Sequence, residues 1–218
     1  MNSFVSTETR NIETPSVEEF IKLLKNLDGF TVLVDMDGVM CKWQEMYDAL
    51  LRQHYPHIPV FPFDQVTRFK TQSFYADEYR AEIAEMMNMK GFYRNLEPMD
   101  GSVQALHMMK EAGIDVFLCT APYVTNKTCA SEKMEWVEEH LGSTWLNRTI
   151  ITSDKTLVRG DVLIDDKPSI KGAMVPSWKH IVFDAPYNRG ITPRLDRWEE
   201  WHKVLGEVAK EIQVVSKG

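Results

Sequence analysis

Four aspartates of this chain stand in two pairs, and each pair directly follows a short apolar run. Asp35 and Asp37 form the first pair, and Asp165 and Asp166 form the second. If both runs are strands of an open α/β sheet, the two pairs meet in the crevice outside the carboxyl ends of the strands. Carboxylates that lie so close repel one another, and a hard divalent cation with oxygen ligands relieves that repulsion. The pattern therefore predicts a metal site for Mg²⁺.

Two other interpretations of the tetrapeptide Asp35-Met36-Asp37-Gly38 compete with a metal site. Asp and Gly are common turn residues, so the tetrapeptide alone could end a strand and do no chemistry. A calcium-binding loop is excluded, because such a loop has its glycine at the sixth position and a glutamate at the twelfth. Here the glycine is fourth and the twelfth residue is Met46. The second acidic pair favours the metal site over the simple turn.

The acidic pairs need a scaffold that brings them together, and the hydrophobic pattern predicts one. Short apolar, β-branched runs predict strands at residues 30–34, 114–119, 148–152, 161–164 and 180–183. Stretches with helical periodicity predict helices at residues 103–111, 131–140 and 196–212. Strands that alternate with helices form a parallel sheet covered on both faces. We therefore predict a doubly wound, Rossmann-like α/β fold.

One long segment, residues 42–95, interrupts this alternation between the first and the second predicted strand. It is too long for a simple crossover connection. Helical patterns at residues 43–53 and 76–89 flank a proline-rich stretch within it. We expect these residues to form a small helical cap, inserted over the carboxyl end of the sheet.

The chain before the first strand predicts a helix of its own. Glu19 stands three residues after Ser16, which is the spacing of a capping box at the start of a helix. Residues 1–28 are therefore expected to form an N-terminal helical extension. The catalytic α/β core is expected over residues 29–41 and 96–218.

The composition excludes several classes of protein. The chain has 218 residues, of which 44% are hydrophobic and 26% are charged, as in a globular protein with a real core. The formal net charge is −7, so no polymeric nucleic acid is expected as a partner. No apolar run approaches the roughly 18 residues of a membrane span. The polar N-terminus has no signal-peptide core, and the three cysteines have no zinc-binding spacing, so we expect a cytoplasmic protein with free thiols.

The residues that follow the predicted strands resemble the four signatures of the haloacid dehalogenase (HAD) superfamily. Asp35 and Asp37 are similar to the first signature, and Thr120, after the second strand, is similar to the second. Lys155 is similar to the third, and the pair Asp165-Asp166 to the fourth. The superfamily has the Rossmann-like fold with a cap after the first strand that the pattern predicts.

Longer strings within residues 30–190 narrow this resemblance to the 5′(3′)-deoxyribonucleotidases of cytosolic and mitochondrial type. The strings are Cys119-Thr120-Ala121-Pro122, residues 132–138, Asp154-Lys155-Thr156, Leu163-Ile164-Asp165-Asp166-Lys167 and Pro176-Ser177-Trp178-Lys179-His180. The resemblance implies a Mg²⁺-dependent phosphatase that removes the 5′-phosphate of deoxyribonucleoside or ribonucleoside monophosphates. The implied partner is thus a small nucleotide, and the oligomeric state is left open, with a homodimer as one option.

The resemblance also implies a role for each residue of the phosphoryl-transfer set. Asp35 would be the nucleophile that forms an aspartyl-phosphate, and Asp37 would be the general acid and base. Thr120 and Lys155 would bind the phosphate. The metal ligands would be Asp35, the main-chain carbonyl of Asp37, and Asp166. Asp165 would support this set without touching the ion, although from the sequence alone the two neighbours could exchange roles.

Other residues are expected to contact the rest of the substrate. Trp43 and Phe69 stand where the resembled enzymes have aromatic side chains that contact the base, and Ala121 stands beside Thr120, where a serine is common. Met87 replaces a tyrosine near the substrate. These departures leave the preferred base and sugar open.

Two alternative functions remain at this point. One is a HAD-type phosphatase for another small phosphate ester. The other is a non-catalytic nucleotide-binding relative, and the presence of both Asp35 and Asp37 argues against it.

Overall fold

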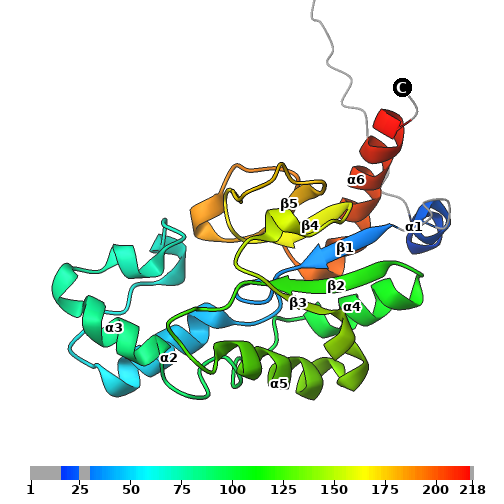
Figure 1. Ribbon diagram of the computed structural model, residues 1–218. Coiled ribbons are helices and arrows are strands. Elements are labelled where there is room, and N and C mark those ends of the chain that lie inside the picture. Colours follow the sequence, from blue (N-terminus) through cyan, green and yellow to red (C-terminus); the bar gives the residue numbers. More distant parts are fainter. Residues whose placement is uncertain (1–15, 25–29, 217–218) are drawn as a thin grey trace, which may run out of the picture.

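The computed structural model describes residues 16–24 and 30–216. Its centre is a six-stranded sheet in the order β3-β2-β1-β4-β5-β6, with every neighbouring pair of strands parallel (Figure 1). The strands are β1 (Thr31–Val34), β2 (Asp115–Thr120), β3 (Thr149–Ile151), β4 (Val162–Asp165), β5 (Lys179–Phe183) and β6 (Arg194–Leu195). The predicted parallel α/β sheet is confirmed. Strand β6 is not predicted, because two residues are too short to give a pattern.

Strand β1 lies where the strand order reverses, between β2 and β4. Val34, its last residue, is in register with Leu118 of β2 and with Ile164 of β4. The three carboxyl ends therefore lie at one edge of the sheet, and the residues that follow them are neighbours. In open α/β sheets this switch point is where ligands bind.

Six α-helices lie within the described residues. They are α1 (Val17–Leu24), α2 (Trp43–His54), α3 (Arg80–Met87), α4 (Ser102–Glu111), α5 (Cys129–Leu141) and α6 (Trp201–Ser216). Helices α3 and α6 begin later than predicted, because the 3₁₀ turns Asp77–Tyr79 and Trp198–Glu200 precede them. None of the helices in this part of the chain has the length and apolar character needed to cross a bilayer.

The two faces of the sheet are covered differently. Successive residues of a strand point to opposite faces. Val32 and Val34 belong to a large buried cluster that includes residues of α4, α5 and α6. Leu33, between them, belongs to a smaller cluster with Trp178 and with strand residues of β2 and β4. On this second face, the chain around Trp178 covers the sheet, and the cluster contains no residue of α4, α5 or α6.

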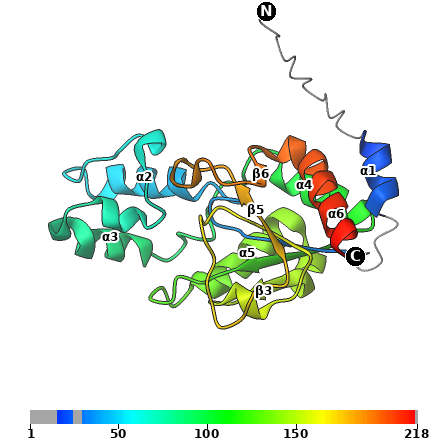
Figure 2. The ribbon, with the colours of Figure 1, turned by 90° about the horizontal axis from the view of Figure 1, so that it is seen from above.

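The inserted segment, residues 42–95, leaves the core and returns to it at one place. Cys41 and Pro98 pair in an isolated antiparallel bridge, and the N–H of Lys42 donates to the carbonyl of Glu97 at 2.8 Å. Helices α2 and α3 lie together beyond the carboxyl ends of the strands (Figure 1 and Figure 2). This arrangement is what an inserted cap requires, and the domain boundaries themselves stay a prediction.

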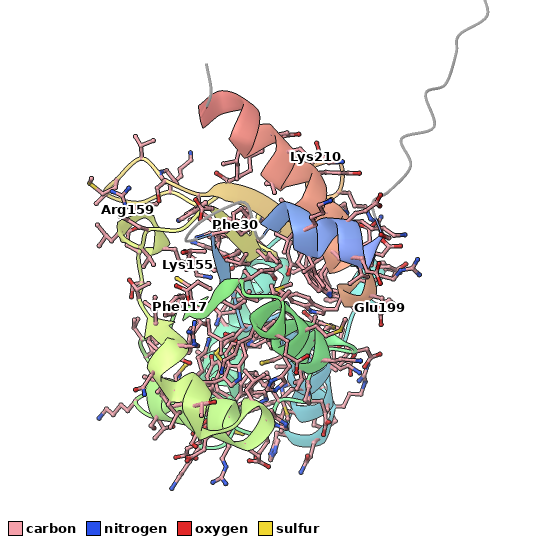
Figure 3. All side chains as sticks on the ribbon, turned by 90° about the vertical axis from the view of Figure 1, so that its right-hand side faces the viewer. Phe30, Phe117, Lys155, Arg159, Glu199 and Lys210 are labelled. Atoms are coloured by element: carbon pink, nitrogen blue, oxygen red, sulfur yellow. The ribbon has the colours of Figure 1, made fainter. Side chains whose placement is uncertain are left out.

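The capping box at the start of α1 is confirmed. The hydroxyl of Ser16 accepts from the N–H of Glu19 at 3.3 Å, and the Glu19 carboxylate accepts from the N–H of Ser16 at 2.8 Å. Helix α1 packs against α6, close to Lys210 (Figure 3). The rest of the predicted extension, residues 1–15 and 25–28, lies outside the described residues.

Candidate active site

The carboxylates at the strand ends meet as predicted. Asp35 follows β1, Asp165 ends β4, and Asp166 comes directly after it. Each offers one carboxylate oxygen to a group in which these oxygens all lie within 4.8 Å of one another. Thr120, the last residue of β2, is fully buried beside them on the neighbouring strand.

A tight turn after β1 sets the position of the first acidic pair. The N–H groups of Val39, Met40 and Cys41 all donate to the carbonyl of Met36, at 2.8–3.1 Å. Gly38 has a φ of 77°, which side chains disfavour, and a Cβ built on it would lie 2.6 Å from the Asp166 carboxylate. Glycine at this position therefore allows the turn to approach the second acidic pair.

Lys155 joins the nucleophile candidate to the second pair. Its Nζ lies 2.7 Å from Oδ1 of Asp35 and 2.5 Å from Oδ2 of Asp165. Burial lowers the pKa of Lys155, but the two carboxylates outweigh it, so the pKa is raised and the lysine stays charged. Burial raises the pKa of Asp35, but Lys155 and Lys133 outweigh it, so that the pKa of Asp35 lies below its ordinary value.

The two neighbouring aspartates differ in their partners. Both oxygens of Asp165 are engaged, one by Lys155 and the other by the N–H of Lys167 at 2.9 Å. Asp166 accepts a hydrogen bond from the Tyr187 hydroxyl through Oδ2. No lysine or arginine among the described residues forms an ion pair with Asp166.

The lack of an ion pair at Asp166 within the described residues bears on whether Asp35, Asp165 and Asp166 suit a metal ion. Burial first, and then the charges of Asp165 and Asp35, raise the pKa of Asp166 well above its ordinary value. A buried carboxylate with no cationic partner, next to two further carboxylates, is a donor set that suits a hard divalent cation. The cluster therefore fits Mg²⁺, and Asp166 is the side chain whose negative charge most needs the positive charge of the ion.

Lys133, on α5, is a site residue that the sequence analysis missed. Its Nζ lies 2.7 Å from Oδ2 of Asp37, 2.7 Å from the hydroxyl of Thr120 and 3.0 Å from the carbonyl of Ala121. A signal was available in the sequence, because Lys133 stands four residues after Cys129 on the apolar face of the helix. Its side chain is only 1% exposed, so this is not a surface lysine.

Asp37 differs from Asp35 in the direction in which its pKa is displaced. Burial raises the pKa of Asp37 above its ordinary value, although Lys133 acts in the opposite direction. Its second oxygen, Oδ1, is buried and has no hydrogen-bond partner in the part of the chain that the structure describes. Two carboxyl groups in one turn thus have pKa values displaced in opposite directions, which is typical of a nucleophile beside a general acid.

Comparison with known proteins identifies the family. The family model described as "5' nucleotidase, deoxy (Pyrimidine), cytosolic type C protein" matches residues 30–212. The chain belongs to this family. It is therefore a 5′-nucleotidase, a phosphoric monoester hydrolase, and the predicted resemblance is confirmed.

Relatives of this nucleotidase cover most of its length. The cytosolic-type 5′(3′)-deoxyribonucleotidase of Homo sapiens is 36% identical over 189 residues, which cover 80% of the chain and 92% of the human protein. A proposed 5′(3′)-deoxyribonucleotidase of Bordetella pertussis is 42% identical over 176 residues, or 80% of the chain and 94% of that protein. The mitochondrial enzyme of Mus musculus is 34% identical, and the match covers 80% of the chain and 84% of that enzyme.

Solved structures agree on the fold of the nucleotidase. The Bacillus subtilis protein YfnB, assigned as a HAD hydrolase and solved bound to magnesium, matches with a TM-score of 0.54 at 12% identity. The match covers 81% of the chain and 98% of YfnB. A likeness at this identity shows the fold alone, and it confirms the Rossmann-like HAD fold.

The aromatic residues predicted to contact the base lie in two different settings in the nucleotidase. The Phe69 ring is 39% exposed and meets the ring of Tyr187 edge-on, with centroids 5.6 Å apart. Trp43 stacks on Tyr47, with ring centroids 5.0 Å apart, and is partly buried against the large hydrophobic cluster. Phe69 is thus linked through Tyr187 to Asp166. A base contact stays a prediction for both Phe69 and Trp43.

Tyr187 and Asn188 are also missed by the sequence analysis. They belong to the 3₁₀ turn Pro186–Asn188, after β5. Asn188 donates through Nδ2 to the carbonyl of Asp166 at 2.6 Å and to that of Phe183 at 2.7 Å. No motif marks this turn, because its role arises only from the tertiary contact with the end of β4.

Proposed function

We propose that this nucleotidase is a Mg²⁺-dependent 5′-deoxyribonucleotidase that works through an aspartyl-phosphate on Asp35. The opposite displacement of the pKa values of Asp35 and Asp37 is the observation that supports this mechanism best. An ionised Asp35 can attack phosphorus, and a protonated Asp37 can donate to the leaving group.

The first step would transfer the phosphoryl group to Asp35. A carboxylate oxygen of Asp35 forms a bond to phosphorus while the bond from phosphorus to the 5′-oxygen breaks. Asp37 gives its proton to that oxygen, so the nucleoside leaves as a neutral alcohol. The unpaired Oδ1 of Asp37 is the atom best suited to carry this proton, because Oδ2 is engaged by Lys133.

The second step would release inorganic phosphate. Asp37, now ionised, takes a proton from a water molecule while the oxygen of that water forms a bond to phosphorus. The bond between phosphorus and Asp35 breaks, and the carboxylate of Asp35 is restored. Asp37 then carries a proton again, which returns both groups to their starting states.

Several charges would bind the phosphate in both steps. Lys155 provides a buried positive charge beside Asp35, and the Thr120 hydroxyl lies within hydrogen-bond reach of Lys133. A Mg²⁺ ion would be held by Asp35, Asp166 and the main-chain carbonyl of Asp37, and it would supply charge that stabilises the phosphoryl oxygens. Asp165 would act through Lys155, with which it forms its closest contact.

Replacing Lys133 by Met should move the alkaline limb of the pH–rate profile to higher pH. The charge of Lys133 favours the ionised form of Asp37, so its loss raises the pKa of Asp37 further. Asp37 then keeps its proton to higher pH. We also expect kcat to fall about 10²-fold at neutral pH, because Asp37 loses the group that orients it.

The measurement is kcat and kcat/KM across the neutral and alkaline range. Lys127→Met, at an exposed lysine, is the matched control and should leave the profile unchanged. An alkaline limb that stays in place in Lys133→Met would show that Lys133 does not act on Asp37.

The substrate class is tested by phosphate release from a panel of compounds. Since the human and mouse relatives are 5′(3′)-deoxyribonucleotidases, we expect deoxyribonucleoside 5′-monophosphates to give higher kcat/KM than their ribose counterparts and than sugar phosphates. At saturating Mg²⁺, Phe69→Ala should raise KM for nucleotides by about tenfold through lost stacking and leave glycerol phosphate unaffected. A higher kcat/KM for sugar phosphates than for every nucleotide would overturn the proposed nucleotide substrate.

We also propose a cytoplasmic location, which the three free, buried cysteines support.

A further inference from the structure

Tyr187 contacts both the acidic cluster and the inserted segment. Its hydroxyl donates to Oδ2 of Asp166, while its ring meets Phe69 and Phe63 edge-on, with centroids 5.6 Å and 6.4 Å apart. Asp166 follows β4 of the sheet, whereas both phenylalanines belong to the insert. The mechanism proposed above gives Tyr187 no role.

The hydroxyl end of Tyr187 constrains Asp166. Because the Tyr187 hydroxyl donates to Oδ2, it limits the rotation of the carboxylate that would hold an ion. Asn188, the next residue, holds the main-chain carbonyl of Asp166 at 2.6 Å, so one short turn binds both the backbone and the side chain of this residue.

The ring end of Tyr187 supports the insert. Phe69 meets Tyr187 on one side, and the Nζ of Lys167 lies 5.6 Å from the centroid of the Phe69 ring. Phe63 makes a second edge-on contact with the same tyrosine. Both phenylalanines are otherwise exposed, by 41% for Phe63 and 39% for Phe69. Two side chains of this part of the insert therefore meet the core at the ring of Tyr187.

We propose that Tyr187 is a positioning residue that couples the metal site to the seating of residues 63–69 on the core. An ion held by Asp166 fixes that carboxylate, the hydroxyl bond then fixes the tyrosine, and the ring offers a fixed surface to Phe69 and Phe63. Coupling of this kind is reciprocal, so the seated insert strengthens ion binding by the same factor. The inference rests on the ion site of the proposed function, but not on the identity of the substrate.

Binding and exchange measurements on the full chain test this proposal without any assay of activity. Mn²⁺ affinity, followed by electron paramagnetic resonance, should fall about tenfold in Tyr187→Phe, which keeps the ring and loses only the hydroxyl. Hydrogen–deuterium exchange of residues 63–69 should slow when Mg²⁺ is added to the wild-type protein, and it should not respond in Tyr187→Phe. The matched control is Tyr55→Phe, which should behave as wild type. It removes a hydroxyl that is hydrogen-bonded to Glu85 within the insert.

A second variant tests the reciprocal effect. Phe69→Ala has no direct contact with Asp166 to lose, yet it should weaken Mn²⁺ binding about threefold, and it should have no further effect in the Tyr187→Phe background. Wild-type Mn²⁺ affinity in Tyr187→Phe would overturn the proposal, as would Mg²⁺-dependent protection of residues 63–69 that persists in that variant. Absence of Mn²⁺ binding by the wild-type protein would overturn the ion site and this inference together. Loss of nucleotide preference in the substrate panel would instead overturn only the proposed substrate class.

Discussion

Asp35→Asn should reduce phosphate release from nucleotides by at least about 10⁴-fold, as removal of a nucleophile does in other hydrolases with covalent intermediates. The amide cannot form the acyl-phosphate bond, so no other part of the site can replace it. The fold should persist, because Lys155 keeps its contact with Asp165 at 2.5 Å. Loss of one negative charge also relieves repulsion on Asp166, so we expect no fall in melting temperature.

The experiment compares phosphate release and thermal unfolding for three proteins: wild type, Asp35→Asn and Asp100→Asn. Asp100 is an exposed aspartate whose carboxylate pairs with Lys42 at 2.7 Å, so it receives the same substitution away from the acidic cluster. Only Asp35→Asn should lose turnover. Release at near-normal rates by a folded Asp35→Asn protein would rule out aspartyl chemistry.

The two acidic pairs and Thr120, which the sequence places in this site, share one property: they lie at the ends of strands, whereas Lys155 lies in a 3₁₀ turn four residues after β3 and was identified only through the family resemblance. A buried strand has a local signature of apolar, β-branched residues, and in a parallel sheet its end has a known position. Asp35, Thr120 and Asp165 could therefore be placed together from their positions in the chain alone. The register of β1 with β2 and β4 confirms that placement.

The residues that the sequence did not predict reach the site from other elements. Lys133 comes from one turn inside α5, where a lysine among glutamates looks like a solvated surface residue. Its place on the apolar face of the helix was a weak signal, and its burial and its contacts with Asp37 and Thr120 show its role. Tyr187 comes from a 3₁₀ turn of three residues, which has no periodicity to detect. Such contacts depend on how loops pack in three dimensions, and a single sequence carries little information about that.

The same contrast holds for the insert. Its two α-helices were predicted, although α3 is shorter than the pattern indicates. The aromatic residues Phe92 and Tyr93 of the insert are buried. The contact of residues 63–69 with the core could not be predicted, because Phe69 and Phe63 meet a tyrosine that lies far along the chain.

Removal of divalent ions should abolish turnover, and Mg²⁺ should restore it. Among the described residues, the cationic side chains that contact the carboxylates of Asp35, Asp37, Asp165 and Asp166 are Lys133 and Lys155. A phosphate dianion would then enter a site with an excess of negative charge, in a protein whose net charge is already −7. The barrier to hydrolysis of a phosphate monoester is very high, so the two lysines alone cannot compensate for the lost positive charge of the ion.

The measurement is phosphate release after dialysis against a chelator, followed by titration with Mg²⁺, with the melting temperature recorded at each step. Activity should be absent after dialysis and should return with Mg²⁺, and the melting temperature should rise with ion concentration because the ion binds only the folded protein. Asp166→Asn is the informative variant, since it should need a far higher Mg²⁺ concentration for both effects, whereas Asp100→Asn should titrate as wild type. If the chelator-treated enzyme kept its full activity, the acidic cluster would have to work with its lysines alone, and Asp166, buried and without a cationic partner, would have no part in phosphoryl transfer.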